Sequence, residues 1–285
     1  MLSNINEIIK TKLNDLNNSG VEVSLFEIKM LMADVLNIET GNLRFYNEPL
    51  TSEQLIKFEE YIELKKNFWP IDKIIGKKWF YKLEFETSKD VLSPRADTEI
   101  LIEEAISLFD ISKNINILEL GTGSGCIVIS LLNEYKNALA LGIDISEKAL
   151  LTTKRNAEKN FVSQRLELLN KSWFDDDILT SINKKFDIIV SNPPYIPTDD
   201  IQELDNEVKN FDPIIALDGG SDGLRDYKKI CALANDLLKD DGYLVFEIGI
   251  NQADDVVKIA QNNNLKLVKI SKDYSSIDRC VILKK

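Results

Sequence analysis

Hydrophobic positions recur every three or four residues across residues 1–75, which is the period of an amphipathic helix. Three such sets lie at residues 5–16, 25–36 and 55–62, and short polar breaks separate them. No strand-like alternation occurs among them. The pattern predicts a small helical domain at the start of the chain.

Short polar residues and a change of period mark the next boundaries. Ser24 and Ser52 are expected to cap the second and third helices, because a hydroxyl can accept a hydrogen bond from a free backbone N–H. Residues 76–92 are rich in aromatic and charged residues without a helical period, which predicts a hairpin linker. Asp97 or Thr98 is then expected to cap a further helix.

Residues 93–285 form the third predicted region, where short apolar runs alternate with helical segments from residue 114 onward. The expected strands are 115–120, 139–144, 165–170, 186–191, 243–248, 265–270 and 279–283. The expected helices begin near Cys126 and cover 146–160, 224–239 and 251–262. Continuous apolar strands between helices are typical of a parallel sheet covered on both faces. The last two strands lack a helix between them, which predicts an antiparallel pair at the edge. The expected fold class is therefore α/β, a Rossmann-like, mostly parallel sheet with an antiparallel edge strand.

Composition narrows the classes of chemistry. The chain has 285 residues, 44% of them hydrophobic, and no apolar run long enough for a membrane span. The first 16 residues mix charged and apolar positions, so no signal peptide is expected. Cys126, Cys231 and Cys280 are few, odd in number and far apart, which favours a reducing, cytoplasmic location over disulfides or a thiolate metal site.

The number of histidines and the net charge indicate which ligands the chain can bind. The chain contains no histidine, which excludes histidine-based acid–base catalysis and histidine-bound zinc, so no metal is expected. The net charge is −12, and the N-terminal 75 residues carry 8 basic against 12 acidic side chains. This balance gives no support for direct nucleic-acid binding.

A glycine-rich turn, ELGTGSG at residues 119–125, joins a predicted strand to a predicted helix. Its three glycines, Gly121, Gly123 and Gly125, allow a tight turn and close approach of a ligand to backbone N–H groups. Cys126 stands where the dinucleotide fingerprint has another glycine, which favours a nucleoside ligand without a pyrophosphate. The alternative is a tight turn that binds nothing.

Two side chains at neighbouring strand ends could complete such a site. Asp144 follows Gly125 by 19 positions and could accept both hydroxyls of a ribose. The alternative role, capping the next helix, could instead fall to Ser146. Trp173 could flank an adenine ring, although on physical grounds a tryptophan is more often part of the core. Glu119 could act near a cationic ligand or could stabilise the turn.

The stretch Asn192-Pro193-Pro194-Tyr195 directly follows an apolar strand, at the edge where open α/β sheets bind ligands. Each proline forces the preceding residue into an extended conformation. The Asn192 side-chain carbonyl and the Pro193 backbone carbonyl would then offer two acceptors to the hydrogens of a planar NH₂ group. Tyr195 could stack on the same group. The alternative is a proline-stiffened turn without a ligand.

These two motifs together resemble the S-adenosylmethionine-dependent amino-methyltransferases, and more narrowly the HemK/PrmC-type glutamine N5-methyltransferases of peptide chain release factors. The likeness covers nearly the whole chain. It includes the helical N-terminal region and the segments 93–105, 142–150, 171–174, 211–230, 243–252 and 278–283. Two mild departures are Ala96, where the family usually has proline, and Asp212, where it commonly has glutamate.

The resemblance implies a role for each matching position. Cofactor binding would involve Gly121, Thr122, Gly123, Ser124, Gly125, Asp144, Trp173 and Asn192. The substrate glutamine would be held by Asn192, Pro193, Pro194 and Tyr195, of which Asn192, Pro193 and Tyr195 would be catalytic. The cofactor would be S-adenosylmethionine, and the partner a class-I release factor that presents the glutamine of its GGQ loop. The helical region would recognise that partner.

Residues 196–223 show little regular pattern, and long loops of this kind in a compact domain are usually functional or disordered. We expect a lid that receives the substrate loop. The competing function is DNA adenine N6-methylation, because the same pair of acceptors fits the adenine amino group. A cofactor-binding scaffold without catalysis and a nicotinamide-dependent oxidoreductase are the remaining, less favoured alternatives.

Overall fold

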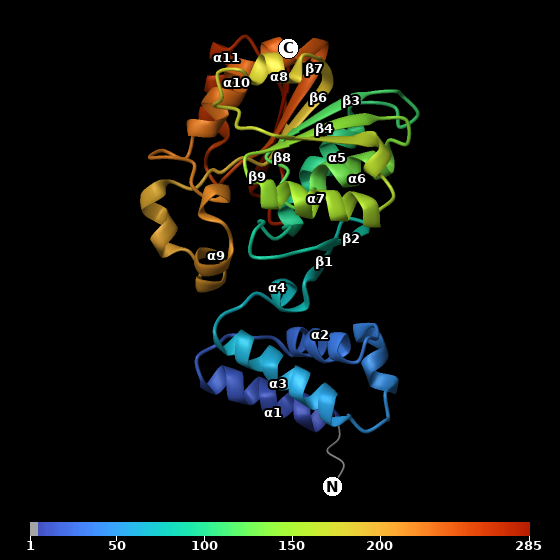
Figure 1. Ribbon diagram of the computed structural model, residues 1–285. Coiled ribbons are helices and arrows are strands. Elements are labelled where there is room, and N and C mark those ends of the chain that lie inside the picture. The colour runs from blue at the N-terminus through green and yellow to red at the C-terminus, as the bar shows by residue number, and fades with distance from the viewer. Residues whose placement is uncertain (1–4) are drawn as a thin grey trace. The chain divides into compact units, whose positions relative to one another are not determined.

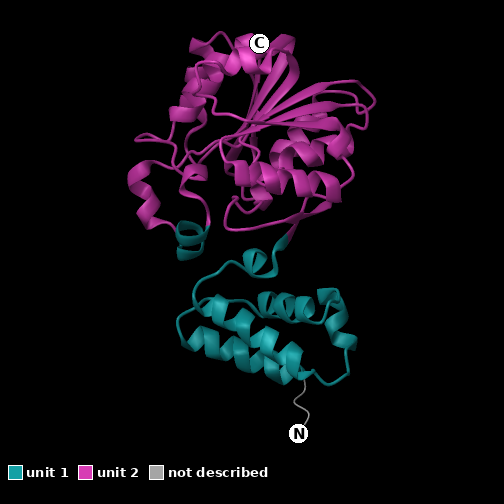
Figure 2. Ribbon diagram, viewed as in Figure 1, with its two compact units in different colours: residues 1–77, 205–211 teal, residues 78–204, 212–285 magenta. Residues whose placement is uncertain are grey.

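The computed structural model describes residues 5–285, and the chain forms two compact units (Figure 2). The first contains the residues up to Lys77 together with Asp205–Phe211. The second contains Lys78–Leu204 and Asp212–Lys285. The helical unit therefore includes a short segment that follows it by more than a hundred positions, which the helical period of the first 75 residues gave no reason to expect.

The first unit is helical, as its hydrophobic period predicts. Its helices within residues 5–77 are α1 (Ile5–Asn18), α2 (Leu25–Val35), the 3-10 helix η1 (Thr40–Phe45), α3 (Ser52–Lys66) and α4 (Ile71–Ile75). Leu16, Ile28 and Phe58 are fully buried in one apolar cluster to which the larger helices contribute. The side chains at three- and four-residue spacing thus form the core of this unit.

The predicted caps of this unit were right for one helix and wrong for the other. Ser24 caps α2, and its hydroxyl accepts from the Glu27 N–H at 3.2 Å. The cap of α3 is Thr51, whose hydroxyl accepts from the Gln54 N–H at 3.2 Å, while Ser52 is the first helical residue. A capping box needs Glu or Gln three positions after the cap, and that spacing selects Thr51.

Segment Asp205–Phe211, which contains helix α9 (Asn206–Phe211), is held in the first unit by two lysines. The Lys65 ammonium is buried and bonds to the Glu207 carboxylate. A buried ammonium requires such a partner. The Lys73 ammonium donates to the Phe211 carbonyl.

A two-stranded hairpin, β1 (Lys77–Phe80) and β2 (Leu83–Glu86), follows where the change of period predicted it. The next helix, α5 (Glu99–Ser107), begins after the 3-10 turn η2 (Ala96–Thr98). Thr98 is its N-cap by position, but neither its hydroxyl nor Asp97 makes a side-chain cap bond. The expected side-chain cap is therefore absent here, and both side chains bond elsewhere in the same unit.

The second unit is built on a seven-stranded sheet with the order β5-β4-β3-β6-β7-β9-β8 (Figure 1). The strands are β3 (Asn116–Leu120), β4 (Leu139–Asp144), β5 (Leu166–Asn170), β6 (Phe186–Ser191), β7 (Leu238–Glu247), β8 (Lys266–Lys272) and β9 (Asp278–Lys284). Strands β3 to β7 are parallel, and β9 pairs antiparallel with both β7 and β8. The predicted mostly parallel sheet with an antiparallel edge is confirmed, with β9 one place inside that edge.

Helices cover both faces of this sheet, as the continuous apolar strands predict (Figure 1). One apolar cluster joins the sheet to α8 (Ile178–Ile182), α10 (Arg225–Leu237) and α11 (Ala253–Asn262). A second cluster joins the other face to α5, α6 (Cys126–Glu134) and α7 (Glu147–Lys159). Leu118 and Leu120 point into the first cluster and Ile117 into the second, which is the alternation of a strand.

The parallel strands β3, β4, β5 and β6 all end at one edge of the sheet, so the polar residues after them meet there. Beyond β6, residues 196–223, which the sequence predicts to have little regular structure, contain three short elements. They are the 3-10 helix η4 (Thr198–Glu203), α9, and the 3-10 helix η5 (Ile214–Ala216). Within residues 5–285, no helix is both long enough and apolar enough to cross a membrane.

Candidate active site

A cavity of about 590 Å³ opens at the carboxyl ends of the parallel strands. This volume is in the range of small-molecule sites. The expected site residues that line it are Gly121, Gly123, Asp144, Trp173, Asn192 and Pro194. Five further expected residues, Thr122, Ser124, Gly125, Pro193 and Tyr195, do not line it. Fold and motif thus bring both halves of the predicted site to one cavity.

The glycine turn is closed by its own backbone and by the end of β4. The N–H groups of Gly121 and Thr122 both donate to the Ile143 carbonyl, at 2.8 and 3.2 Å. The Gly125 N–H donates to the Thr122 carbonyl at 2.7 Å, which tightens the turn immediately before α6. The turn is therefore a rigid wall of the cavity.

The second half of the turn serves packing. Gly125 has φ +80°, and a Cβ atom added to it would lie 2.8 Å from the side chains of Ile129 and Thr153. The Ser124 carbonyl accepts from the Asn156 amide at 2.8 Å, and Ser124 is buried. The close contacts account for a glycine at position 125, and the bond to the Ser124 backbone fixes the turn without requiring a serine. Ligand contact by either residue stays a prediction.

Asp144 lies at the end of β4 and faces the cavity. Its Oδ2 accepts from the Gly123 N–H at 2.8 Å and its Oδ1 from the Ser146 N–H at 2.9 Å. Burial raises the pKa of Asp144, and these two N–H groups partly offset that rise. The cap of α7 is Ser146, whose hydroxyl accepts from the Ala149 N–H at 3.2 Å. Asp144 is therefore left as a fixed carboxylate with lone pairs available to a ligand.

Glu119 lies under the turn. Its Oε2 accepts from the Val128 N–H at 3.2 Å, and its Oε1 has no hydrogen-bond partner within residues 5–285. Complete burial raises the pKa of Glu119 well above its ordinary value, which favours the neutral form. Glu119 could act near a cationic ligand or could stabilise the turn, and its position and its bond to α6 favour stabilisation of the turn.

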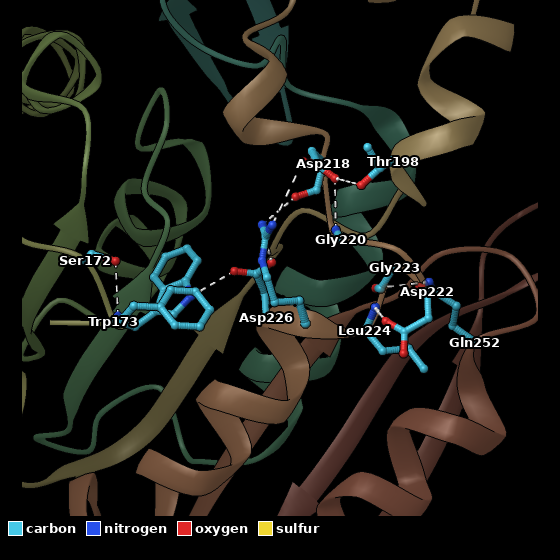
Figure 3. Close-up of polar contacts among 12 residues, drawn as sticks. Ser172, Trp173, Thr198, Asp218, Gly220, Asp222, Gly223, Leu224, Asp226 and Gln252 are labelled. Atoms are coloured by element: carbon cyan, nitrogen blue, oxygen red, sulfur yellow. Dashed lines mark hydrogen bonds and ion pairs between the residues drawn. The ribbon is translucent and has the colours of Figure 1, made fainter. Parts of the chain in front are cut away.

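Trp173 belongs to the core and also lines the cavity. A Cβ atom on Gly121 would lie 3.5 Å from the indole ring, so the ring rests against the glycine turn. The indole Nε1–H donates to Asp226 Oδ1 at 2.9 Å, a bond drawn in Figure 3. Trp173 is therefore a core residue that also forms part of the cavity wall, and its contact with a ligand stays a prediction.

Asn192 directly follows β6 and lines the cavity. Its Nδ2 donates to the Thr98 hydroxyl at 3.4 Å, and its Oδ1 accepts no hydrogen bond from residues 5–285. Tyr195 turns the other way: its hydroxyl donates to Glu247 Oε1 at 3.4 Å, and its backbone carbonyl accepts from Gln252 at 2.9 Å. Contact of Tyr195 and Pro193 with a substrate stays a prediction.

Glu247 is a buried carboxyl at the end of β7, behind the Asn192 turn. Burial raises its pKa to about 7, although hydrogen bonds from Thr98 and Tyr195 and the charge of Arg279 oppose that rise. Thr98 thus interacts with both Asn192 and Glu247. No sequence pattern assigned this carboxyl a role.

Sequence reasoning missed one wall of the cavity, which the region after α9 supplies. The residues from this region that line it are Pro213, Ile214, Ile215, Ala216, Asp218, Arg225 and Asp226. They fall within the segment 211–230 that carried the family resemblance without assigned roles. Asp212, one of the two departures, accepts from the Arg95 guanidinium at 2.6 Å, so a shorter carboxylate still makes this ion pair.

Comparison with protein families gives two matches in this chain. The model described as the PrmC N-terminal domain matches residues 7–76. The model described as a methyltransferase domain matches residues 111–278, more than half of the chain. Both parts expected from the sequence are therefore recognised independently.

Comparison with individual proteins agrees. A release factor glutamine methyltransferase of Fusobacterium nucleatum is 41% identical over 98% of this chain and 78% of its own length. One from Agrobacterium fabrum is 38% identical over 94% of this chain and 92% of its own length. A solved methyltransferase structure from Pyrococcus furiosus has a TM-score of 0.52 at 14% identity, covering 82% of this chain and 99% of that one. That last likeness shows the fold alone.

Proposed function

Because this chain belongs to the release factor glutamine methyltransferase family, we propose that it methylates a glutamine side-chain nitrogen in class-I peptide chain release factors. The methyl donor is S-adenosylmethionine. The observation that carries the proposal is Asn192, whose Oδ1 is left without a partner from residues 5–285 in the cavity that Gly123 and Asp144 also line. DNA adenine methylation finds no support among the relatives named above.

The cavity fits this cofactor in size and in chemistry. Asp144 offers carboxylate oxygens for two ribose hydroxyls. Nothing lies within 4 Å of a Cβ atom added to Gly123, so a ligand can approach the turn there. The Trp173 ring supplies an apolar wall for the base. When bound, S-adenosylmethionine supplies a methyl group on a positively charged sulfur.

The protein's part in the reaction is to make an amide nitrogen nucleophilic. An amide nitrogen is a weak nucleophile because its lone pair is delocalised into the carbonyl. If Asn192 Oδ1 and the Pro193 carbonyl accept the two N–H groups, electron density rises at nitrogen and its lone pair is fixed in direction. Such positioning lowers a barrier by several kcal/mol. After methyl transfer the positively charged nitrogen releases one of its two protons to water, so no strong base on the protein is required.

The release factor as partner is supported by the relatives' names and by the domain match over residues 7–76. Three cysteines without disulfides fit the reducing cytoplasm, where translation termination occurs. Residues 196–223 then form a lid over the substrate loop. Limited proteolysis with and without release factor tests the lid: we expect protection of this stretch in the complex, and unchanged cleavage would count against it.

The function is tested by mass spectrometry. Purified enzyme is incubated with S-adenosylmethionine and a purified release factor, and the products are digested and sequenced. We expect a mass increase of one methyl group on a single glutamine. A release factor in which that glutamine is replaced by asparagine is the matched control and should stay unmodified. Methyl transfer to duplex DNA but not to the release factor would overturn the proposal.

A further inference from the structure

Hydrogen bonds extend from Trp173, on the cofactor side of the cavity, through Asp226 toward the loop that contains Asp218 (Figure 3). Asp226 is 1% exposed, and one of its carboxylate oxygens accepts from the Trp173 Nε1–H at 2.9 Å. The other accepts from the Arg225 guanidinium at 3.0 Å. Asp226 lies in the first turn of α10, where a carboxylate often bonds to free backbone N–H groups. Its carboxylate instead bonds to Trp173, outside the helix, and to the guanidinium of the neighbouring Arg225, the first residue of α10.

Arg225 continues this path to the loop. Its guanidinium also donates to the Asp218 carbonyl at 2.6 Å, and its backbone N–H donates to the Gly219 carbonyl at 3.1 Å. The Asp218 carboxylate in turn accepts from the Thr198 hydroxyl at 2.7 Å and from the Gly220 N–H at 2.9 Å (Figure 3). The side chain of Asp218 is thereby fixed from two directions.

The loop that contains Asp218 packs directly on the turn that contains Asn192. A Cβ atom on Gly219 would lie 2.7 Å from the Pro194 carbonyl oxygen and 2.9 Å from Tyr195 Cα, so the two backbones are in contact. The Gly219 N–H donates to the Ile196 carbonyl at 2.9 Å. Displacement of this loop would therefore displace the Asn192 turn.

We propose that Asp226 and Arg225 are positioning residues for methyl transfer. Asp226 holds the Trp173 ring against the glycine turn, and Arg225 links that carboxylate to the loop that supports Asn192. Together they fix the spacing between the cofactor wall and the residues that hold the amide. Both also line the cavity, on the wall that the sequence did not identify. This inference rests on the proposed function.

Asp226 is expected to affect the dissociation constant of the cofactor product, and Arg225 is expected to affect kcat. Asp226→Ala frees the indole, so the dissociation constant of S-adenosylhomocysteine, measured by calorimetry, should rise about tenfold. Asp226→Asn retains an oxygen that can accept from Nε1–H, so affinity should stay within about threefold of wild type. Arg225→Met keeps the Trp173 bond but breaks the link to Asp218. Its kcat should fall about tenfold at saturating cofactor, with affinity within about threefold.

A double-mutant cycle separates positioning from general destabilisation. Trp173→Phe keeps an aromatic ring against the glycine turn but removes the Nε1–H. Combined with Asp226→Ala, it should add little further loss of S-adenosylhomocysteine affinity, because both changes remove one bond. Additive losses would overturn the proposal. Asp255→Asn, which breaks the exposed ion pair with Lys258 in the same unit, is the matched control and should change neither constant.

A fluorescence measurement reports on the ring without any ligand. With Trp69 and Trp79 replaced by phenylalanine, Trp173 is the remaining tryptophan. Its emission should shift to the red in Asp226→Ala and stay unchanged in Asp226→Asn. If Asp226→Ala fails to fold, Trp173→Phe alone decides, and wild-type cofactor affinity in that variant would refute the inference. These ligand-binding and spectral results do not depend on the methyl acceptor, so they can fail while release-factor methylation succeeds, and the reverse.

Discussion

The two halves of the cavity are held in different ways. On the cofactor side, Asp144 bonds to Gly123, 21 positions away, and to Ser146, two positions away. On the substrate side, Asn192 bonds to Thr98, 94 positions away. Apart from Trp173, whose Nε1–H bonds to Asp226, 53 positions away, the first half is a local motif that folds with its own strands and turn. The second depends on distant parts of the chain, so its geometry is set by the packing of the whole unit.

The largest effect is expected on the substrate side. Asn192→Ala removes the open acceptor, and loss of substrate positioning of this kind costs about 100-fold in rate. We expect kcat for release-factor methylation to fall by at least about that factor, while S-adenosylhomocysteine affinity changes little. Asn137→Ala, at an exposed turn, is the control. A kcat equal to wild type would remove Asn192 from the mechanism.

On the cofactor side, a substitution should instead lower the affinity for the cofactor. Asp144→Ala is expected to cost about 1.5–3 kcal/mol in cofactor affinity, the range for hydrogen bonds to a charged group. Asp144→Asn retains one acceptor oxygen and should lose less. Calorimetry with S-adenosylhomocysteine measures both, with Asp240→Ala at a fully exposed position as the control. Unchanged affinity in Asp144→Ala would mean that the carboxylate only ties the turn to β4.

The same contrast explains how much the sequence could predict. The glycine turn and Asp144 form within one strand–turn–helix–strand unit, so spacing along the chain was enough to place them. Glu247 and Gln252 lie 52 and 57 positions from Tyr195, which they contact, and no local pattern reports that pairing. The Tyr195 hydroxyl accordingly bonds to a carboxyl that no local pattern pairs with it, and the stacking of its ring on a substrate stays a prediction.

Other differences between the predicted and the observed structure also depend on whether the contacts involved are local or distant in the sequence. The strands and their order along the chain could be predicted from continuous apolar runs, because a strand that is buried on both faces of a sheet needs apolar residues at successive positions. The segment Asp205–Phe211 is polar and short, and its place in the helical unit depends on a buried ion pair between Lys65 and Glu207. A single sequence contains no signal for such a pairing. The cap of α3 could have been found, since the Thr51–Gln54 spacing is local.

Glu247, the buried carboxyl on the substrate side, should also make the free energy of unfolding depend on pH. The unfolded chain ionises Glu247 near its ordinary value of 4.5, whereas the folded chain keeps that proton up to about pH 7. The unfolded state then binds fewer protons, so this residue's contribution to stability is full below about pH 4.5 and is lost as pH rises toward 7. Between pH 5 and pH 8, the unfolding free energy of the wild type should therefore fall by roughly 2 kcal/mol more than that of Glu247→Gln, which has no carboxyl to ionise at this position.

Urea unfolding at a series of pH values measures this effect. The absolute stability of Glu247→Gln can differ from wild type because an amide replaces a carboxyl in a buried site. The slope against pH is therefore the informative quantity. Glu103→Gln, an exposed carboxyl in α5, is the control and should leave the slope as it is. An identical slope in Glu247→Gln and wild type would mean that the buried carboxyl is ionised at neutral pH.

The smallest effect tests whether the cofactor side is as local as its bonds suggest. Ser146→Ala removes the hydroxyl that caps α7 but keeps the backbone N–H that donates to Asp144. Loss of such a cap costs about 1 kcal/mol in unfolding free energy. Cofactor affinity should stay within about twofold of wild type, because the Asp144 carboxylate keeps both of its N–H partners. A cofactor affinity that falls in step with stability would show instead that the α7 cap and the cofactor site are coupled, and the contrast between a local and a distant half would fail.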